Sequence, residues 1–227
     1  GISVGDINGI GLEVIMKAFS DNRIFDLCTP VVYASSNYAM AYQKEMGMKN
    51  FSFNFVKPNA KIISKRANLI NCWEGDVKLS LGEETAEGGA YALKSLTAAV
   101  DALKKGEVDA LVTAPINKHN IQSEAFNFPG HTEYLAKEFD GGDALMFMIA
   151  DSLRIGVVTG HIPIADVASA ISVDKILEKV EQIDYSLKSD FKIRKPKIAV
   201  LGLNPHSGDK GVIGKEDEEV IIPAVKK

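Results

Sequence analysis

Short apolar runs alternate with longer segments of helical period along the chain. Several runs are rich in β-branched or aromatic residues, too short for a typical helix, and bounded by polar or turn residues, as strands are. The predicted strands are residues 29–34, 52–56, 68–73, 108–114, 144–150, 154–160 and 197–203. The pattern therefore predicts a sheet whose strands are separated along the chain by helices.

Two of the intervening segments carry helical stripes. The first, in residues 86–106, ends at Gly106 and consists of Leu93, Leu96, Val100 and Leu103. The second, in residues 172–188, consists of Val173, Ile176, Leu177, Val180, Ile183 and Leu187. This alternation predicts an α/β fold with a largely parallel sheet covered by helices. Ligands of such sheets bind where the strands end at their carboxyl termini.

The domain organisation has few local markers, because the chain holds no repeat and no flexible linker. We place a boundary near Pro129 to His131, which gives domains of residues 1–130 and 131–227. The chain opens on a glycine-rich loop with no room for a strand before it. It closes on an acidic first turn of a helix, whose apolar face has barely begun at Val220 and Ile221. We hypothesise that the sequence is part of a longer protein.

Composition excludes several classes of protein. The 227 residues are 46% hydrophobic and 25% charged, which is typical of a globular chain. A net charge of -4 with scattered lysines argues against nucleic acid as a partner. Two distant cysteines, Cys28 and Cys72, support neither a disulfide framework nor a cysteine zinc site. No apolar run reaches the roughly 20 residues of a membrane span. We expect a soluble, cytoplasmic protein.

The four histidines carry the strongest chemical signal. His119, His131, His161 and His206 each lie in a loop after a strand or at the start of a helix, beside glycine or proline. For one such histidine, hydrogen bonding to local backbone is as reasonable an interpretation as a function. The recurrence of the pattern favours function.

His161 and His206 each follow a strongly apolar predicted strand and have a neighbouring proline. If those strands are neighbours, the two imidazoles project at one edge of the sheet, which suits Zn²⁺ or a similar divalent cation. A catalytic metal needs about three protein ligands. The third would come from Asp209, Asp166 or residues outside this chain.

Three further residues are candidates for binding an anion. Lys118, in "TAPINKHNI", presents a charge suited to a phosphate or carboxylate, although on the pattern alone a solvated lysine at a helix start is the better explanation. His131 and Thr132 open the predicted helix of "FPGHTEYLA", where free N–H groups suit an anion. Thr132 also has the residue type of a helix N-cap.

The first glycine-rich loop, "GDINGIGLE", does not have the spacing of a dinucleotide-binding fingerprint. It indicates a tight turn, and only weakly an anion site. No cofactor-binding residue and no catalytic residue can be assigned from the pattern.

Taken together, "GDINGIGLE", "TAPINKHNI", "FPGHTEYLA", "LRIGVVTGHIP" and "LGLNPHSGDKGVIGKEDEEVIIPA" resemble the successive motifs of the 4-hydroxythreonine-4-phosphate dehydrogenase family of vitamin B6 biosynthesis. The resemblance runs from residue 1 to residue 227. It implies a fold like isocitrate and isopropylmalate dehydrogenases, with two α/β domains and a cleft between them. It also implies a homodimer with the active site at the subunit interface.

The activity implied by the resemblance is oxidation of 4-phosphooxy-L-threonine by NAD, followed by loss of CO₂ to give 3-amino-2-oxopropyl phosphate. NADP is the alternative cofactor. By motif, His161 and His206 carry over as metal ligands, and His131 and Thr132 as substrate contacts. Zinc is the first expectation for the metal, with magnesium or cobalt as alternatives.

The sequence departs from the family pattern in two places. The family's third metal histidine belongs to a motif that residues 1–227 do not contain, so that ligand is expected beyond residue 227. The first loop has Asp-Ile-Asn and Gly-Leu-Glu where many members have Asp-Pro-Ala and Gly-Pro-Glu. Two alternatives stay open: a related dehydrogenase of 4-phospho-D-threonate or 4-phospho-D-erythronate, and a non-catalytic module that binds a phosphorylated metabolite or a metal.

Overall fold

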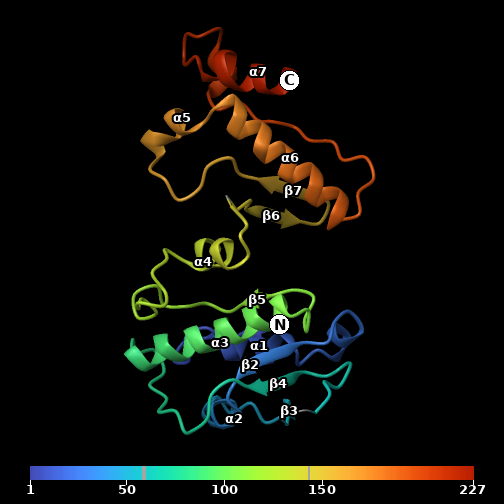
Figure 1. Ribbon diagram of the computed structural model, residues 1–227, viewed down its shortest axis with the longest axis vertical. Helices are drawn as coiled ribbons and strands as arrows, with labels where there is room; N and C mark the ends of the chain where they lie inside the picture. The colour runs from blue at the N-terminus through green and yellow to red at the C-terminus, as the bar shows by residue number, and fades with distance from the viewer. Residues whose placement is uncertain (58–59, 143) are drawn as a thin grey trace. The chain divides into compact units, whose positions relative to one another are not determined.

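The computed structural model describes residues 1–57, 60–142 and 144–227, and Figure 1 shows its elements. The chain forms two compact units, Gly1–Gly142 and Asp143–Lys227. This division falls later than the boundary that we place between residues 130 and 131. The reason is that α4 (His131–Glu138) packs its Tyr134 on Leu96 and Phe126 of the first unit.

The first unit is built on a five-stranded parallel sheet, as the alternation of apolar runs predicts. Its strand order is β3-β4-β2-β1-β5, and every pair is parallel. The strands are β1 (Ile2–Ser3), β2 (Val31–Ala34), β3 (Asn54–Val56), β4 (Asn68–Asn71) and β5 (Val112–Thr113). The α/β fold class is confirmed for this unit.

The expectation that no strand precedes the first glycine-rich loop is wrong. β1 lies in the interior of the sheet, with Ile2 opposite Val32 of β2 on one side and Val112 of β5 on the other. Its ladder partners define it, because a strand this short has no periodicity of its own. Both β1 and β5 therefore deliver a loop at the same edge of the sheet.

Helices cover both faces of this sheet (Figure 1). In β2 the side chains of Val32 and Ala34 join the core beneath α1 (Gly11–Ala18) and α2 (Ser36–Glu45). Val31 and Tyr33 point the other way, toward Ala99 and Ala102 of α3 (Ala86–Lys104). Successive residues of a strand face opposite sides, so one apolar run serves two helix layers.

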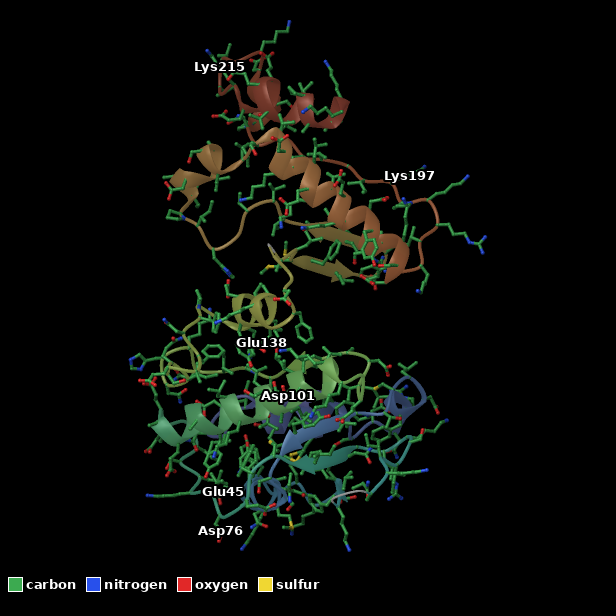
Figure 2. All side chains as sticks on the ribbon, viewed as in Figure 1. Glu45, Asp76, Asp101, Glu138, Lys197 and Lys215 are labelled. Atoms are coloured by element: carbon green, nitrogen blue, oxygen red, sulfur yellow. The ribbon has the colours of Figure 1, made fainter. Side chains whose placement is uncertain are left out.

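α4 lies along α3 within the first unit. Lys104 of α3 makes an ion pair of 2.5 Å with Glu138 of α4. Figure 2 labels Glu138 of α4, and also Asp101, which lies near Lys104 in the last turns of α3. A short 3-10 helix (Asn22–Asp26) connects α1 to β2.

The second unit contains an antiparallel hairpin, so the expected parallel arrangement is wrong here. β6 (Phe147–Ala150) pairs with β7 (Leu153–Gly156), and α6 (Val173–Ser189) packs on one face, where Ile183 lies against Gly156. The remaining elements are short: residues Ile164–Asp166, α5 (Val167–Ala170), Pro205–Gly208, the π-helix η4 (Asp217–Ile221) and α7 (Ile222–Lys226).

The strand predicted at residues 197–203 does not form. A strand needs a neighbouring chain to accept its ladder of hydrogen bonds. Residues 197–201 instead line a cavity of about 530 Å³ together with β7 and α6. The apolar run is thus placed beside β7 without pairing to it in the described part of the chain.

Two further properties follow from the described residues. None of their helices has the length and apolar character needed to cross a membrane. Cys28 and Cys72 both carry free thiols.

Candidate functional site

The loops that leave β1 and β5 are packed against each other. The N–H of Asp6 donates to the carbonyl of Pro115 at 3.0 Å. Gly5 has φ +68°, and a Cβ added there would lie 2.1 Å from the Pro115 oxygen. Only glycine fits such a conformation and approach. In the sheet, β2, β4 and β3 lie on one side of β1, and β5 lies on the other. The strand order therefore reverses between β1 and β5, and α/β sheets bind ligands at such a topological switch point.

A buried polar network fixes these loops to the start of α3. Asp6, which is 7% exposed, accepts hydrogen bonds from the N–H of Asn8 at 2.9 Å and from the amide of Asn120 at 2.9 Å. Asn8 in turn donates to the hydroxyl of Thr85 at 2.9 Å. That hydroxyl caps α3 by accepting from the N–H of Gly88. Gly5 and Gly11 of the first loop thus serve close packing, since a Cβ added at Gly11 would lie 2.1 Å from the carbonyl oxygen of Val4.

Lys118 is carried to the mouth of α4 by a folded-back loop. The side-chain amide of Gln122 donates to the carbonyl of Lys118 at 3.0 Å and to that of Phe128 at 2.9 Å. The Cε atom of Lys118 lies 3.8 Å from the position of a Cβ added at Gly130. The structure therefore brings Lys118 and His131, predicted separately, to one place.

His131 and Thr132 are the first two residues of α4. The N-cap is Gly130, with extended backbone and no side-chain cap. The alternative interpretation of Thr132 as the N-cap is therefore wrong, and its hydroxyl is not needed to start the helix. Lys118 and the first N–H groups of α4 bring positive charge to this place, and the Glu133 carboxylate lies there too, with its Oε2 3.6 Å from the position of a Cβ added at Gly130.

The ring of His131 is partly buried, and its Nε2 atom has no hydrogen-bond partner within the described structure. Burial, followed by the positive charge of Lys118, lowers the pKa of His131 below its ordinary value. Both effects favour the neutral imidazole, whose Nε2 is buried without a partner in the described structure. A buried polar atom without a partner needs an explanation, such as a bound water, a strained conformation or a functional role.

A second cluster near this edge was not predicted. Nδ1 of His119 lies 2.6 Å from Oε1 of Glu84, and the amide of Asn117 donates to Oε2 of Glu84 at 2.7 Å. These hydrogen bonds, that of His119 first, lower the pKa of the Glu84 carboxyl. His119 stands out in the sequence as a loop histidine. Its partner lies in a polar stretch that carries no local signal.

In the second unit, His161 and His206 share an unusual backbone conformation. Their φ angles are 55° and 52°, in the left-handed region that residues other than glycine seldom adopt. Seven other non-glycine residues among those described also have a positive φ angle, Ser207, Asp209 and Lys210 among them, so this conformation alone does not mark a site. The segments ahead of the two histidines, residues 157–159 and 200–203, line one cavity of about 250 Å³.

The donor chemistry of these two histidines fits a divalent cation such as Zn²⁺, because neutral imidazole is one of its common ligands. Among the residues that the structure describes, however, no group of three or more His, Cys, Asp or Glu side chains could hold a metal ion. Neither Asp166 nor Asp209 completes such a group. The third ligand stays a prediction.

The loop that carries His206 is anchored by Asp217 of η4. This carboxylate is 1% exposed and accepts hydrogen bonds from the N–H groups of Leu203 and Asn204, each at 3.1 Å. It also accepts from the side-chain amide of Asn204 at 2.9 Å. The sequence indicates Asp217 only as part of an acidic helix start, because its loop partners are distant along the chain.

Comparison with known proteins identifies relatives of the whole chain. The family model "Pyridoxal phosphate biosynthetic protein PdxA" matches residues 26–227. A 4-hydroxythreonine-4-phosphate dehydrogenase of Bacteroides thetaiotaomicron is 42% identical over 100% of this chain and 62% of its own length. A protein of Oceanobacillus iheyensis, provisionally named as a D-threonate 4-phosphate dehydrogenase, is 29% identical over 100% of this chain and 69% of its own.

Among solved structures, a 4-hydroxythreonine-4-phosphate dehydrogenase from Burkholderia phymatum superposes with a TM-score of 0.83. It is 31% identical and is matched over 100% of this chain and 69% of that chain. The present chain thus spans less than two thirds of the Bacteroides relative.

Proposed function

This chain belongs to the PdxA family of pyridoxal phosphate biosynthetic proteins, and from that premise we propose that the protein is an NAD-dependent dehydrogenase of 4-phosphooxy-L-threonine. The oxidised product, a β-keto acid, loses CO₂ to give 3-amino-2-oxopropyl phosphate. The name of the Bacteroides relative at 42% identity supports this choice of substrate.

The mouth of α4 is the observation that carries the proposal. Lys118 and the Glu133 carboxylate both lie beside Gly130 at the start of α4, whose first two residues are His131, with a buried and unpartnered Nε2 in the described structure, and Thr132. We assign the anionic part of the substrate to the lysine and the helix N–H groups. The neutral His131 ring and the Thr132 hydroxyl orient the substrate by hydrogen bonds.

His161 and His206 are assigned as two ligands of a divalent cation, with zinc expected first and a third histidine expected beyond residue 227. When bound, such a cation lowers the pKa of the substrate hydroxyl and polarises the new ketone, while NAD accepts the hydride. No residue is assigned to NAD, because the first glycine-rich loop does not have the spacing of a dinucleotide-binding fingerprint. Assembly as a homodimer with an active site at the interface completes the proposal.

A second substrate is favoured by one observation, the provisional name of the Oceanobacillus relative. D-threonate 4-phosphate would share the phosphate and hydroxyl contacts but has no amine. The test is NADH formation by the full-length protein with each substrate in turn. We expect kcat/KM to be higher for 4-phosphooxy-L-threonine.

The reverse preference would assign the protein to the sugar-acid reaction and leave the dehydrogenase class intact. Binding of both compounds without NADH formation would instead identify a non-catalytic module. Calorimetric titration of the same preparations distinguishes these two outcomes.

A further inference from the structure

Asp217 is a buried charge whose bonds lead directly to a proposed metal ligand. Its Oδ1 accepts from the N–H of Leu203, and its Oδ2 accepts from the N–H and the side-chain amide of Asn204. Only Pro205 separates this anchored backbone from His206. Because the proline ring fixes its own φ angle, little freedom remains between the anchor and the histidine.

The loop is also closed tightly around this anchor. A Cβ added at Gly202 would lie 2.8 Å from Oδ1 of Asp217, and one at Gly214 would lie 2.5 Å from the amide nitrogen of Asn204. Within this enclosure His206 has its left-handed φ of 52°. A strained conformation of this kind persists only where the surroundings impose it.

We propose that Asp217 is a positioning residue, which holds the 202–206 backbone in the conformation that presents the His206 imidazole to the divalent cation. This inference rests on the proposed metal site. No bond is recorded between Asp217 and the imidazole, and it acts through the backbone N–H groups that it binds. Replacing a residue that orients a metal ligand typically lowers metal affinity by roughly 10- to 100-fold.

Stability alone does not account for a carboxylate at this position. Burying a charge costs desolvation energy, and an apolar side chain of similar volume avoids that cost. What an apolar side chain does not supply is an acceptor for two consecutive N–H groups ahead of His206. The bonds to Leu203 and Asn204 therefore indicate a role in loop conformation.

The test is a Co²⁺ titration of the metal-free, full-length protein, followed through the visible absorption bands of the bound ion. In Asp217→Asn the side chain keeps its shape but turns an NH₂ group toward N–H donors. We expect Co²⁺ affinity to fall on the order of tenfold or more, with the circular dichroism of the metal-free protein unchanged.

Glu216→Gln is the matched control. Glu216 accepts from the same Asn204 amide at 2.8 Å, but its backbone partners are the N–H groups of Lys215 and of Glu216 itself, which follow His206 along the chain. Its replacement should leave the affinity as in the wild type. Gly202→Ala is a milder perturbation, because the added Cβ displaces the Asp217 carboxylate without removing it. It should weaken Co²⁺ binding in the same direction.

Wild-type affinity in both Asp217→Asn and Gly202→Ala would overturn the inference. An equal loss in Glu216→Gln would also overturn it, because any change of charge in the loop would then have the same effect. His206→Ala separates this failure from that of the proposed function. If His206→Ala binds Co²⁺ like the wild type, the metal site itself is wrong.

Discussion

Replacing Gly89 by alanine tests the packing that positions Lys118. Gly89 is buried in α3, and a Cβ added there would lie 1.9 Å from the carbonyl oxygen of Asn120 and 2.3 Å from its carbon. Close carbon–oxygen contacts are about 3.3 Å or longer, so the loop must move by roughly 1.4 Å. The obstacle is backbone, which cannot be relieved by a change of rotamer.

Two effects of opposite sign determine the stability of Gly89→Ala. Alanine in place of glycine stabilises a helix interior by about 1 kcal/mol. Overpacking against backbone costs about 3 kcal/mol, the upper part of its usual range. We therefore expect the free energy of unfolding to fall by about 2 kcal/mol. Because Asn120 and Lys118 share one loop, kcat/KM should also fall on the order of tenfold or more.

Urea unfolding and steady-state kinetics of the full-length protein measure both effects. Ala90→Gly is the matched control, because residue 90 is exposed in the same helix and its replacement reports helix propensity alone. We expect that change to lower the free energy of unfolding by about 1 kcal/mol. A Gly89→Ala protein at least as stable as the wild type, with unchanged kinetics, would refute the reasoning. The close approach of α3 to the Lys118 loop would then be absent.

Two further predictions concern the mouth of α4. In an NMR titration His131 should have a pKa below its ordinary value, since burial and then Lys118 disfavour the charged ring. Its contribution to stability is thus present above about pH 6.5 and lost as the pH falls toward the lowered pKa. Lys118→Ala should raise that pKa, and no change would remove Lys118 from the site. Thr132→Val should raise the substrate KM on the order of tenfold and change the free energy of unfolding by less than about 0.5 kcal/mol. A destabilised variant with a normal KM would instead indicate a structural role for Thr132.

The strands and long helices of the first unit could be predicted because their burial follows a local period. Val31 to Ala34 alternate between two helix layers, and Leu96 and Val100 lie on one stripe of α3. β1 could not be predicted, since its evidence is the ladder on either side of Ile2. Residues 197–203 have the composition of a strand, but composition does not supply a partner chain.

The candidate site was predictable in its residue types and not in its geometry. Histidine in a loop beside glycine or proline made His131, His161 and His206 candidates from the sequence, and their functional roles stay predictions. The approach of Lys118 to His131 depends on the Gln122 amide bridging two carbonyls. The anchoring of the His206 loop depends on Asp217, more than ten positions along the chain. Contacts between distant residues leave no periodic signal.

The most direct test of the central claim is NADH formation from 4-phosphooxy-L-threonine by the full-length protein, measured before and after metal removal with a chelator. We expect turnover that is lost with the metal and restored when Zn²⁺ or another divalent cation is added back. Turnover that persists in the chelated protein would contradict the assignment of His161 and His206 to a catalytic cation.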